Sequence, residues 1–196
     1  MSAPVGGAAA IALLVSALAC AESAVSGAQS HIPDRARIDL LVGTRVLGVG
    51  FTAPRDTSAW GAEGVWAWND RVLELRGNHQ WLLATSEPLA FSAHLGATAL
   101  VVPVGGFDVG GGPQAGLTLG WSGQIIRFDV GLEGGAEGFF TSSGLRFPVR
   151  LVPALRARLG RLELGLVAKA GLDLTVKAPS AFRYEALALV GVALPQ

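Results

Sequence analysis

Ser92 and His94 are the two residues of this 196-residue chain whose types and spacing suggest nucleophilic catalysis. In an extended strand, side chains two positions apart point to the same face, so we expect the hydroxyl and the imidazole to be neighbours. Acyl transfer by such a pair also requires a carboxylate that orients the imidazole and a donor for the oxyanion. The sequence does not identify either the carboxylate or the oxyanion donor. We therefore expect that the protein is not an enzyme. In the alternative interpretation, in which it is one, Ser92 and His94 are the catalytic candidates.

Other kinds of reactive site lack the residues that they require. The three histidines are far apart and Cys20 is the single cysteine, so we expect no metal site and no disulfide. The glycine-rich stretch 105–114, GGFDVGGGPQ, is not followed by Gly-Lys-Ser/Thr and has no strand–loop–helix context, so it indicates a loop. We expect no cofactor. The chain carries 15 basic and 15 acidic residues, which gives no reason to expect a nucleic-acid partner.

The N-terminus has the pattern of an export signal. Residues 8–19, AAAIALLVSALA, form an apolar run of twelve that ends among small residues. This length suits the hydrophobic part of a signal peptide and is too short for a membrane-spanning helix, which needs ~20 apolar residues. We predict a signal peptide over 1–28 and a single domain over 29–196. Because Cys20 follows Ala-Leu-Ala, as in a degraded bacterial lipobox, lipidation of Cys20 is an alternative.

Most of the chain after residue 29 alternates between apolar and polar residues with period two. In Arg161–Val176, RLELGLVAKAGLDLTV, every even position is apolar and every charge is at an odd position. The charges would scatter around a helix but share one face of a strand. Five further segments alternate in the same way, and 184–194 is apolar on both faces. The five segments are 38–46, 89–101, 115–122, 125–134 and 147–159.

The spacing of these segments predicts about eight strands. The stretch Trp60–Ser86 is less regular, and Arg71–Ser86 within it is interpreted as irregular extensions, although a hairpin turn at Gly77-Asn78 would make ten strands. Short connections such as Gly160 alternate with longer stretches rich in glycine and proline. An antiparallel meander threaded through a membrane has short turns at one end and longer loops at the other. The longer stretches are 49–59, 103–112 and 135–146.

The composition favours a barrel with its polar face inside. Hydrophobic residues make up 51% of the chain and charged residues 15%, against the ~25% charge usual in soluble domains. An eight-stranded barrel has a lumen just wide enough for side chains, where opposite charges can pair and offset their desolvation. The alternative is a secreted or lipid-anchored soluble β-sandwich that binds a partner. The predicted lumen charges are Asp39, Arg127, Asp129, Glu133, Arg150, Arg156, Arg158, Arg161, Glu163, Lys169 and Asp173.

The signal peptide and the strands RLELGLVAKAGLDLTV and RFPVRLVPALRARLG resemble the small outer-membrane β-barrels of Gram-negative bacteria, of the outer-membrane protein A and X type. The resemblance implies an all-β, antiparallel up-and-down transmembrane barrel in the cell outer membrane, in contact with outer-membrane lipid. It implies a structural or surface-binding role and a narrow, filled lumen rather than a wide pore.

Three further expectations follow from the resemblance. The long loops GFTAPRDTSA and GGAEGFFTSSG would present a surface to an unknown protein or a small ligand. Some barrels of this kind modify lipids with a serine–histidine pair, which gives the alternative that uses Ser92 and His94. Aromatic side chains are expected in girdles at the membrane interfaces. The candidates are Trp60, Trp66, Trp68, Trp81, Trp121, Phe139, Phe140 and Tyr184.

Overall fold

The computed structural model describes residues 29–68, 71–103, 108–140, 144–176 and 179–195, and these residues form a single antiparallel sheet. None of the described residues belongs to a helix long and apolar enough to cross a membrane. The strands are β1 (Arg37–Gly43), β2 (Val46–Arg55), β3 (Ser58–Ala67), β4 (Val72–Ser86), β5 (Leu89–Val102), β6 (Asp108–Ser122), β7 (Ile126–Gly135), β8 (Glu137–Phe139), β9 (Leu145–Leu159), β10 (Leu162–Val176) and β11 (Ala181–Ala193).

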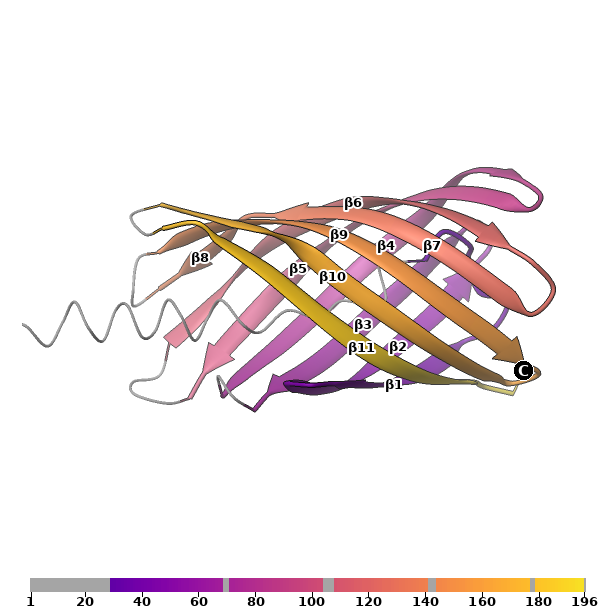
Figure 1. Cartoon of the computed structure of the whole chain (residues 1–196), viewed down its shortest axis with the longest axis horizontal. Coiled ribbons are helices and arrows are strands. Elements are labelled where there is room, and N and C mark those ends of the chain that lie inside the picture. Colours follow the sequence, from indigo (N-terminus) through magenta and orange to yellow (C-terminus); the bar gives the residue numbers. More distant parts are fainter. Residues whose placement is uncertain (1–28, 69–70, 104–107, 141–143, 177–178, 196) are drawn as a thin grey trace, which may run out of the picture.

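The sheet closes into a ten-stranded barrel because β1 pairs with β11 and β9 pairs with β10. The wall strands cross the barrel obliquely and neighbours in the wall are neighbours in the chain (Figure 1). The extra strand, β8, continues β7 in the same register against β6. Gln114 pairs with Gly135 in β7, and Gly110 pairs with Phe139 in β8.

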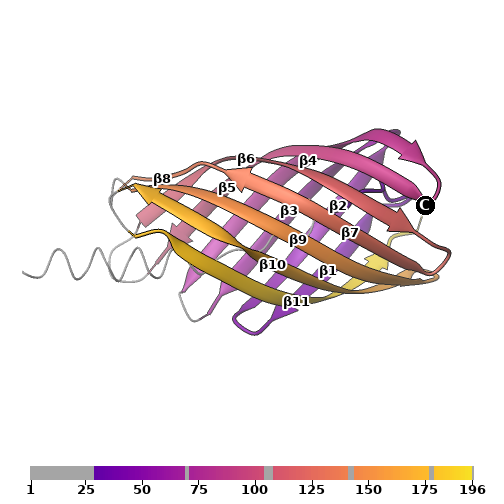
Figure 2. The ribbon, with the colours of Figure 1, turned by 45° about the horizontal axis from the view of Figure 1, so that its top comes forward.

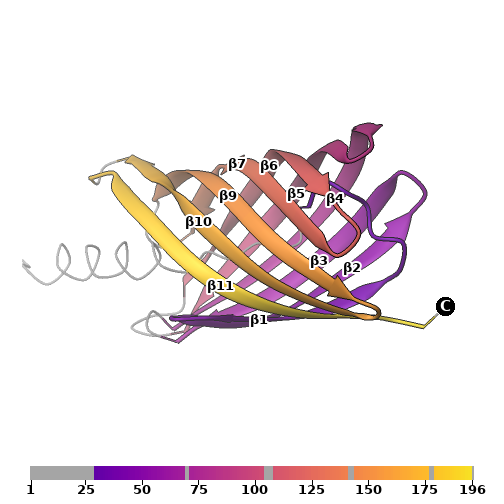
Figure 3. The same ribbon diagram turned by 45° about the vertical axis from the view of Figure 1, so that its right-hand side comes forward.

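Both ends of the wall, the start of β1 and the end of β11, lie at one end of the barrel (Figure 3). We call this the terminal end. The hairpin turns at the terminal end are tight, and two of them use a residue with positive φ, Asp56 at 51° and Gly160 at 63°. Two-residue hairpin turns favour such residues because their backbone twist then matches that of the strands. Turning the barrel by 45° shows the same closed wall (Figure 2).

The alternation of residues sends charges into the lumen and apolar side chains to the outside. On β10, Glu163, Lys169 and Asp173 are buried, whereas Leu164 and Leu166 are 40% and 63% exposed. The same alternation of buried and exposed positions runs along the other long strands. A β-sandwich would place those leucines between two sheets; the chain instead forms one closed sheet with the leucines on its outer face.

The lumen also contains an apolar layer. Buried aliphatic side chains from β1 to β5, among them Leu41, Val65 and Leu100, pack together inside the wall with Leu187 and Leu189 of β11. Most of these residues lie toward the end of the barrel opposite the terminal end. The interior is therefore packed with side chains, polar over most of its length and apolar at this layer.

The expected count of eight strands is wrong, because ten strands close the wall. Arg71–Ser86, interpreted as an irregular extension, contains the whole of β4. A β-bulge between Leu82 and Ala84 shifts its register against β5, which interrupts the period of two. Gly77 and Asn78 lie within β4, so the ten-strand alternative had the right number but placed a turn where the strand is continuous.

Each of the three stretches expected to be long loops contains strand residues among those that the structure describes. Residues 49–59 form most of β2 and the start of β3, joined by Asp56 and Thr57. β6 begins at Asp108 within 103–112, and 135–146 holds β8 and the start of β9. Glycine and proline are typical of loops, but Pro54 of β2 and Pro113 of β6 are paired with neighbouring strands in the wall.

Candidate functional site in the barrel lumen

The first group of lumen charges surrounds Glu163 of β10. Its carboxylate accepts hydrogen bonds from Arg37 Nη1 at 2.7 Å and from Arg156 Nη1 at 3.2 Å. Arg37 also pairs with Asp39, with 2.7 Å between Nε and Oδ1, and Arg156 Nε lies 3.9 Å from Asp129 Oδ2. All five side chains are buried. Charges from four strands, β1, β7, β9 and β10, thus compensate one another inside the wall, as buried ions require.

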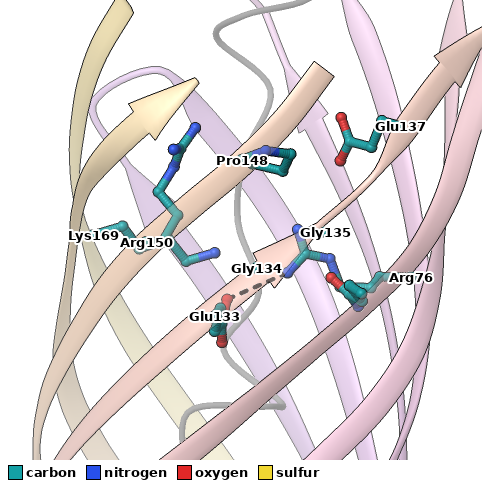
Figure 4. A pocket seen from close by; sticks show the side chains of 9 residues that line it. Arg76, Glu133, Gly134, Gly135, Glu137, Pro148, Arg150 and Lys169 are labelled. Atoms are coloured by element: carbon teal, nitrogen blue, oxygen red, sulfur yellow. Dashed lines mark ion pairs between the residues drawn. The ribbon is translucent and has the colours of Figure 1, made fainter. Parts of the chain in front are cut away.

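The second group lies farther along the lumen around Arg76 of β4. Arg76 donates to Glu74 at 2.6 Å and its Nη1 lies 3.9 Å from Glu133 Oε2, an ion pair drawn in Figure 4. His94 Nε2 lies 4.0 Å from the other oxygen of Glu133. Arg76, Glu133 and Lys169 line a cavity of about 20 Å³, which holds roughly one water molecule. This space admits no larger solute.

The third group lies toward the end opposite the terminal end. Arg146 donates from Nε to Glu137 Oε2 at 2.8 Å, and its Nη1 lies 3.6 Å from Asp173 Oδ2. Arg150 donates to Asp173 and, at 2.7 Å, to the carbonyl oxygen of Leu172. Asp173 therefore bridges two arginines of β9 from its position on β10.

The segment before β1 enters the lumen and binds to the inner wall. Gln29 and Ser30 are fully buried. Ser30 donates to Asp129 Oδ1 twice, from its backbone N–H at 3.0 Å and from its hydroxyl at 2.5 Å. The carbonyl oxygen of Gln29 accepts from Ser92 Oγ at 2.9 Å and from Gln80 Nε2. Main chain that belongs to no strand thus occupies the interior alongside the side chains.

Ser92 and His94 share the inner face of β5, and both are buried. The Ser92 hydroxyl donates to the Gln29 carbonyl, while His94 Nε2 faces Glu133. None of the hydrogen bonds between described residues joins Ser92 to His94. In this arrangement the serine hydroxyl donates to a main-chain carbonyl rather than to the imidazole.

The structure places eight of the eleven predicted lumen charges in these groups, and three of them elsewhere. Arg127 is half-buried. Arg158 and Arg161, expected in the lumen, are exposed at the terminal end, with Arg161 in the turn between β9 and β10. Alternation identifies the face of a strand but not the depth of a residue along the barrel, and both arginines lie where strands end. Cys20 and the predicted signal peptide lie outside the described residues.

Several lumen residues were not among the predicted lumen charges, and all of them except Arg37 lie in segments interpreted as irregular or as loops. The signal was present in VLELRG, where Glu74 and Arg76 alternate with Leu73 and Leu75. Arg37 likewise precedes Asp39 by two positions on the same face. The unpredicted lumen residues are Arg37, Glu63, Glu74, Arg76, Asn78, Gln80, Asp108, Glu137 and Arg146.

One ion pair lies at the rim of the terminal end, at exposed positions outside the lumen. Arg158 donates to both carboxylate oxygens of Asp34 at 2.7 and 2.8 Å, and this hydrogen bonding lowers the pKa of Asp34 below its ordinary value. The pair anchors the segment that precedes β1 to the end of β9. Among the described residues, no group of three histidine, cysteine, aspartate or glutamate side chains is arranged to hold a metal ion.

Aromatic side chains gather on the outer surface near both ends. Toward the terminal end, His79 lies between Trp60 and Trp81, with ring centroids 4.1 and 4.4 Å apart. At the other end of β3, Trp66 faces outward and is 38% exposed. Phe139, expected among these outward rings, instead points inward and is buried, because it continues the inner face of β7 into β8.

No protein-family model matches the chain, and the comparison with curated proteins found no match.

Proposed function

We propose that this protein is a transmembrane β-barrel of a bacterial outer membrane, with a structural or surface-binding role and a lumen closed to solutes. The single observation that carries the proposal is that the polar face of the sheet points inward and the apolar face outward, the reverse of a soluble protein. Charged side chains are paired in the interior, while leucine, valine and aromatic side chains cover the outside. In water such a surface would expose apolar patches far larger than those of soluble monomers, whereas in hydrocarbon it is the favourable arrangement.

The dimensions of the outer surface agree with a bilayer. On β10 the outward apolar positions run from Leu162 to Val176, a strand of 15 residues. At ~3.3 Å per residue this strand is about 46 Å long, and a tilt of ~45° leaves about 33 Å along the barrel axis. The hydrocarbon core of a bilayer is ~30 Å thick. The aromatic rings near both ends occupy the depth at which outer-membrane barrels carry their girdles.

The filled lumen supports a role other than bulk transport. Buried ion pairs, the apolar layer around Leu41 and the segment at Gln29 and Ser30 occupy the described interior. Exposed side chains available to a partner, a protein or a small ligand, lie instead at the end opposite the terminal end. Phe140 and Tyr184 are each 83% exposed there.

Cell fractionation combined with gel mobility tests the membrane assignment. The protein should be recovered with the outer membrane, should float with lipid vesicles after refolding, and should migrate anomalously in a detergent gel unless it is boiled. Recovery as a monodisperse soluble protein without detergent would contradict the proposal. N-terminal sequencing of the same material tests cleavage after residue 28 against lipidation of Cys20, since a lipidated cysteine would begin the mature chain at position 20.

A further inference from the structure

We propose that the mouth of the lumen at the terminal end binds a phosphate group through Arg35, Arg127 and Arg161. The inference goes beyond the proposed function, because it concerns a group that docks at the mouth and does not pass through the filled lumen. These three arginines line a cavity of about 20 Å³, which lies between the ends of β7, β9 and β10 and the segment before β1. The volume suits roughly one water-sized group, such as one oxygen of a phosphate.

The lining of this cavity carries more positive than negative charge. Four arginines and two carboxylates line it, which leaves an excess of two positive charges. Both carboxylates already have partners. Asp34 accepts hydrogen bonds from Arg158 at 2.7 and 2.8 Å, and Glu163 accepts from Arg37 and Arg156. The first lumen group does not reduce the excess, because its two arginines face two aspartates in addition to Glu163.

Arg127 of β7 lacks an acceptor for its buried donors. Its Nε and Nη1 atoms are buried and make no hydrogen bond within the described part of the chain. It lies directly opposite Arg156 in the register of β7 and β9, where like charges repel. The carboxylates whose charge reaches it are Asp129 and Glu163. Asp129 accepts two hydrogen bonds from Ser30, and Glu163 accepts from Arg156. An anion in the cavity would supply the missing acceptor and offset the repulsion.

Arg35 and Arg161 reach the same cavity from two other parts of the chain. Arg35 is half-buried in the segment before β1, which is held by the ion pair of Asp34 and by a backbone hydrogen bond of 2.7 Å from Leu194 to Ala36. Arg161 is exposed in the turn between β9 and β10. Among the described residues, neither arginine has a hydrogen bond or an ion pair through its side chain. Both guanidinium groups are therefore available to a ligand.

The chemistry of the lining selects a phosphate monoester or free phosphate. The planar donors of a guanidinium group match the oxygens of a carboxylate or a phosphate. An excess of two positive charges favours a phosphate monoester, which carries about −1.5 to −2 at neutral pH, over a carboxylate or a lipid phosphodiester, each with a single charge. Exposed Arg158 and Arg161 form the outer edge of the cavity, so a dissolved phosphate can reach it from water. Leu162, which also lines the cavity, lies at the start of the apolar outer surface, so a lipid headgroup is the other source to test.

Titration calorimetry of the full chain with inorganic phosphate, in a non-ionic detergent at constant ionic strength, measures the binding. Wild type should show one saturable site. Arg127→Gln should weaken the affinity about tenfold or more, because a hydrogen bond between charged groups shifts an equilibrium by at least that factor. Arg45→Gln is the matched control, since Arg45 is an exposed arginine in the turn between β1 and β2, at the other end of the barrel. The absence of a saturable site in wild type, or equal affinities of wild type and Arg127→Gln, would overturn the proposal.

Thermal unfolding separates a binding role of Arg127 from a structural one. In phosphate-free buffer Arg127→Gln should unfold at the same temperature as wild type or higher, because the substitution removes no ion pair and relieves the repulsion from Arg156. Phosphate should raise the Tm of wild type and of Arg45→Gln, and should leave that of Arg127→Gln unchanged. Destabilisation of Arg127→Gln without phosphate would overturn the proposal. Equal stabilisation by chloride at the same ionic strength would also overturn it, because the effect would then be screening alone.

Competition identifies the source of the phosphate group. Glycerol phosphate, a monoester, should displace inorganic phosphate from the wild-type protein, whereas phosphatidylglycerol in mixed micelles should not. Displacement by the lipid alone would overturn the assignment to a soluble monoester. All of these measurements are made in detergent, so their outcome does not depend on whether the barrel spans a membrane.

Discussion

Arg37 Nη1 lies 2.7 Å from Glu163 Oε1, although 126 residues separate the two in the chain. Arg37 is on β1 and Glu163 on β10, and β11 lies between these strands in the wall. The ion pair therefore crosses the inner face of β11, at the seam where the first and last strands meet. Gly191 of β11 leaves the room for this contact, because a Cβ there would lie 2.3 Å from Asp39 Oδ1 and 3.1 Å from Arg37 Cδ.

Replacing Arg37 with alanine should strongly destabilise the barrel. The substitution leaves Asp39 with no arginine at 2.7 Å and removes one donor from Glu163, and an uncompensated buried charge costs about 3 kcal/mol or more. Urea unfolding of the refolded protein in lipid vesicles measures the change. The control is Arg161→Ala at the exposed turn, which should change the free energy of unfolding by no more than about 0.5 kcal/mol. Equal effects of the two substitutions would contradict a stabilising role for the seam.

Arginine substitutions along β9 distinguish lipid from water around the barrel. Leu151 lies near the middle of β9 and Leu159 at its end, and their exposures are similar, 49% and 54%. In a bilayer, Leu151→Arg should cost about 2–4 kcal/mol and Leu159→Arg about 0–1 kcal/mol, because the cost depends on depth. In water both would be nearly neutral. Unfolding in vesicles provides the comparison, and two equally small effects would refute the membrane assignment.

Gly171 of β10 should not tolerate a side chain. A Cβ there would lie 1.9 Å from the carbonyl oxygen of Val149 and 2.9 Å from the Cα of Arg150, so the backbones of β9 and β10 would have to separate. We expect Gly171→Ala to destabilise the barrel by about 1–3 kcal/mol. Gly77→Ala of β4 serves as the control, because a Cβ at Gly77 would meet nothing within 4 Å. If both variants unfold at the same urea concentration, the close approach of the two strands is not required for stability.

The rim pair of Asp34 and Arg158 should make a small contribution that depends on pH. Because hydrogen bonds from Arg158 lower the pKa of folded Asp34, the stabilisation is present above the ordinary carboxyl pKa and is lost as the pH falls through the lowered value. The side chains are 62% and 45% exposed, so the contribution should stay below about 1 kcal/mol. The free energy of unfolding should be measured for wild type and Asp34→Asn at neutral and at strongly acidic pH. Wild type should be the more stable at neutral pH, and the two should be equally stable in acid. A stability difference that grows as the pH falls would contradict the prediction.

Substitution of Ser92 or His94 should leave membrane lipids unchanged. The Ser92 hydroxyl donates to a carbonyl oxygen rather than to His94, and both side chains are buried within the filled lumen. We expect lipid A from cells that produce wild type, Ser92→Ala or His94→Ala to have identical mass spectra. A modification present with wild type and absent with both variants would instead support the lipid-modifying alternative.

The contrast between β10 and β4 shows how far the sequence predicts this fold. On β10 the charges at alternate positions identified a strand and its two faces correctly. On β4 the same alternation is present at Glu74 and Arg76, but glycine, asparagine and histidine follow and a bulge at Leu82 shifts the register. A period of two is read over several consecutive residues, so one bulge and a few residues of mixed polarity were enough to hide a strand of 15 residues.

The sequence by itself determined the all-β class, the faces of the regular strands and the side that carries charge, because these properties depend only on neighbours one and two positions away. The tertiary structure decided what depends on distant partners. Ten strands rather than eight close the wall because β1 meets β11, and Arg37 meets Glu163 only after that closure. The position of Ser30 beside Asp129 also could not be predicted from the sequence, since a short segment without periodicity carries no local signal of what it will contact.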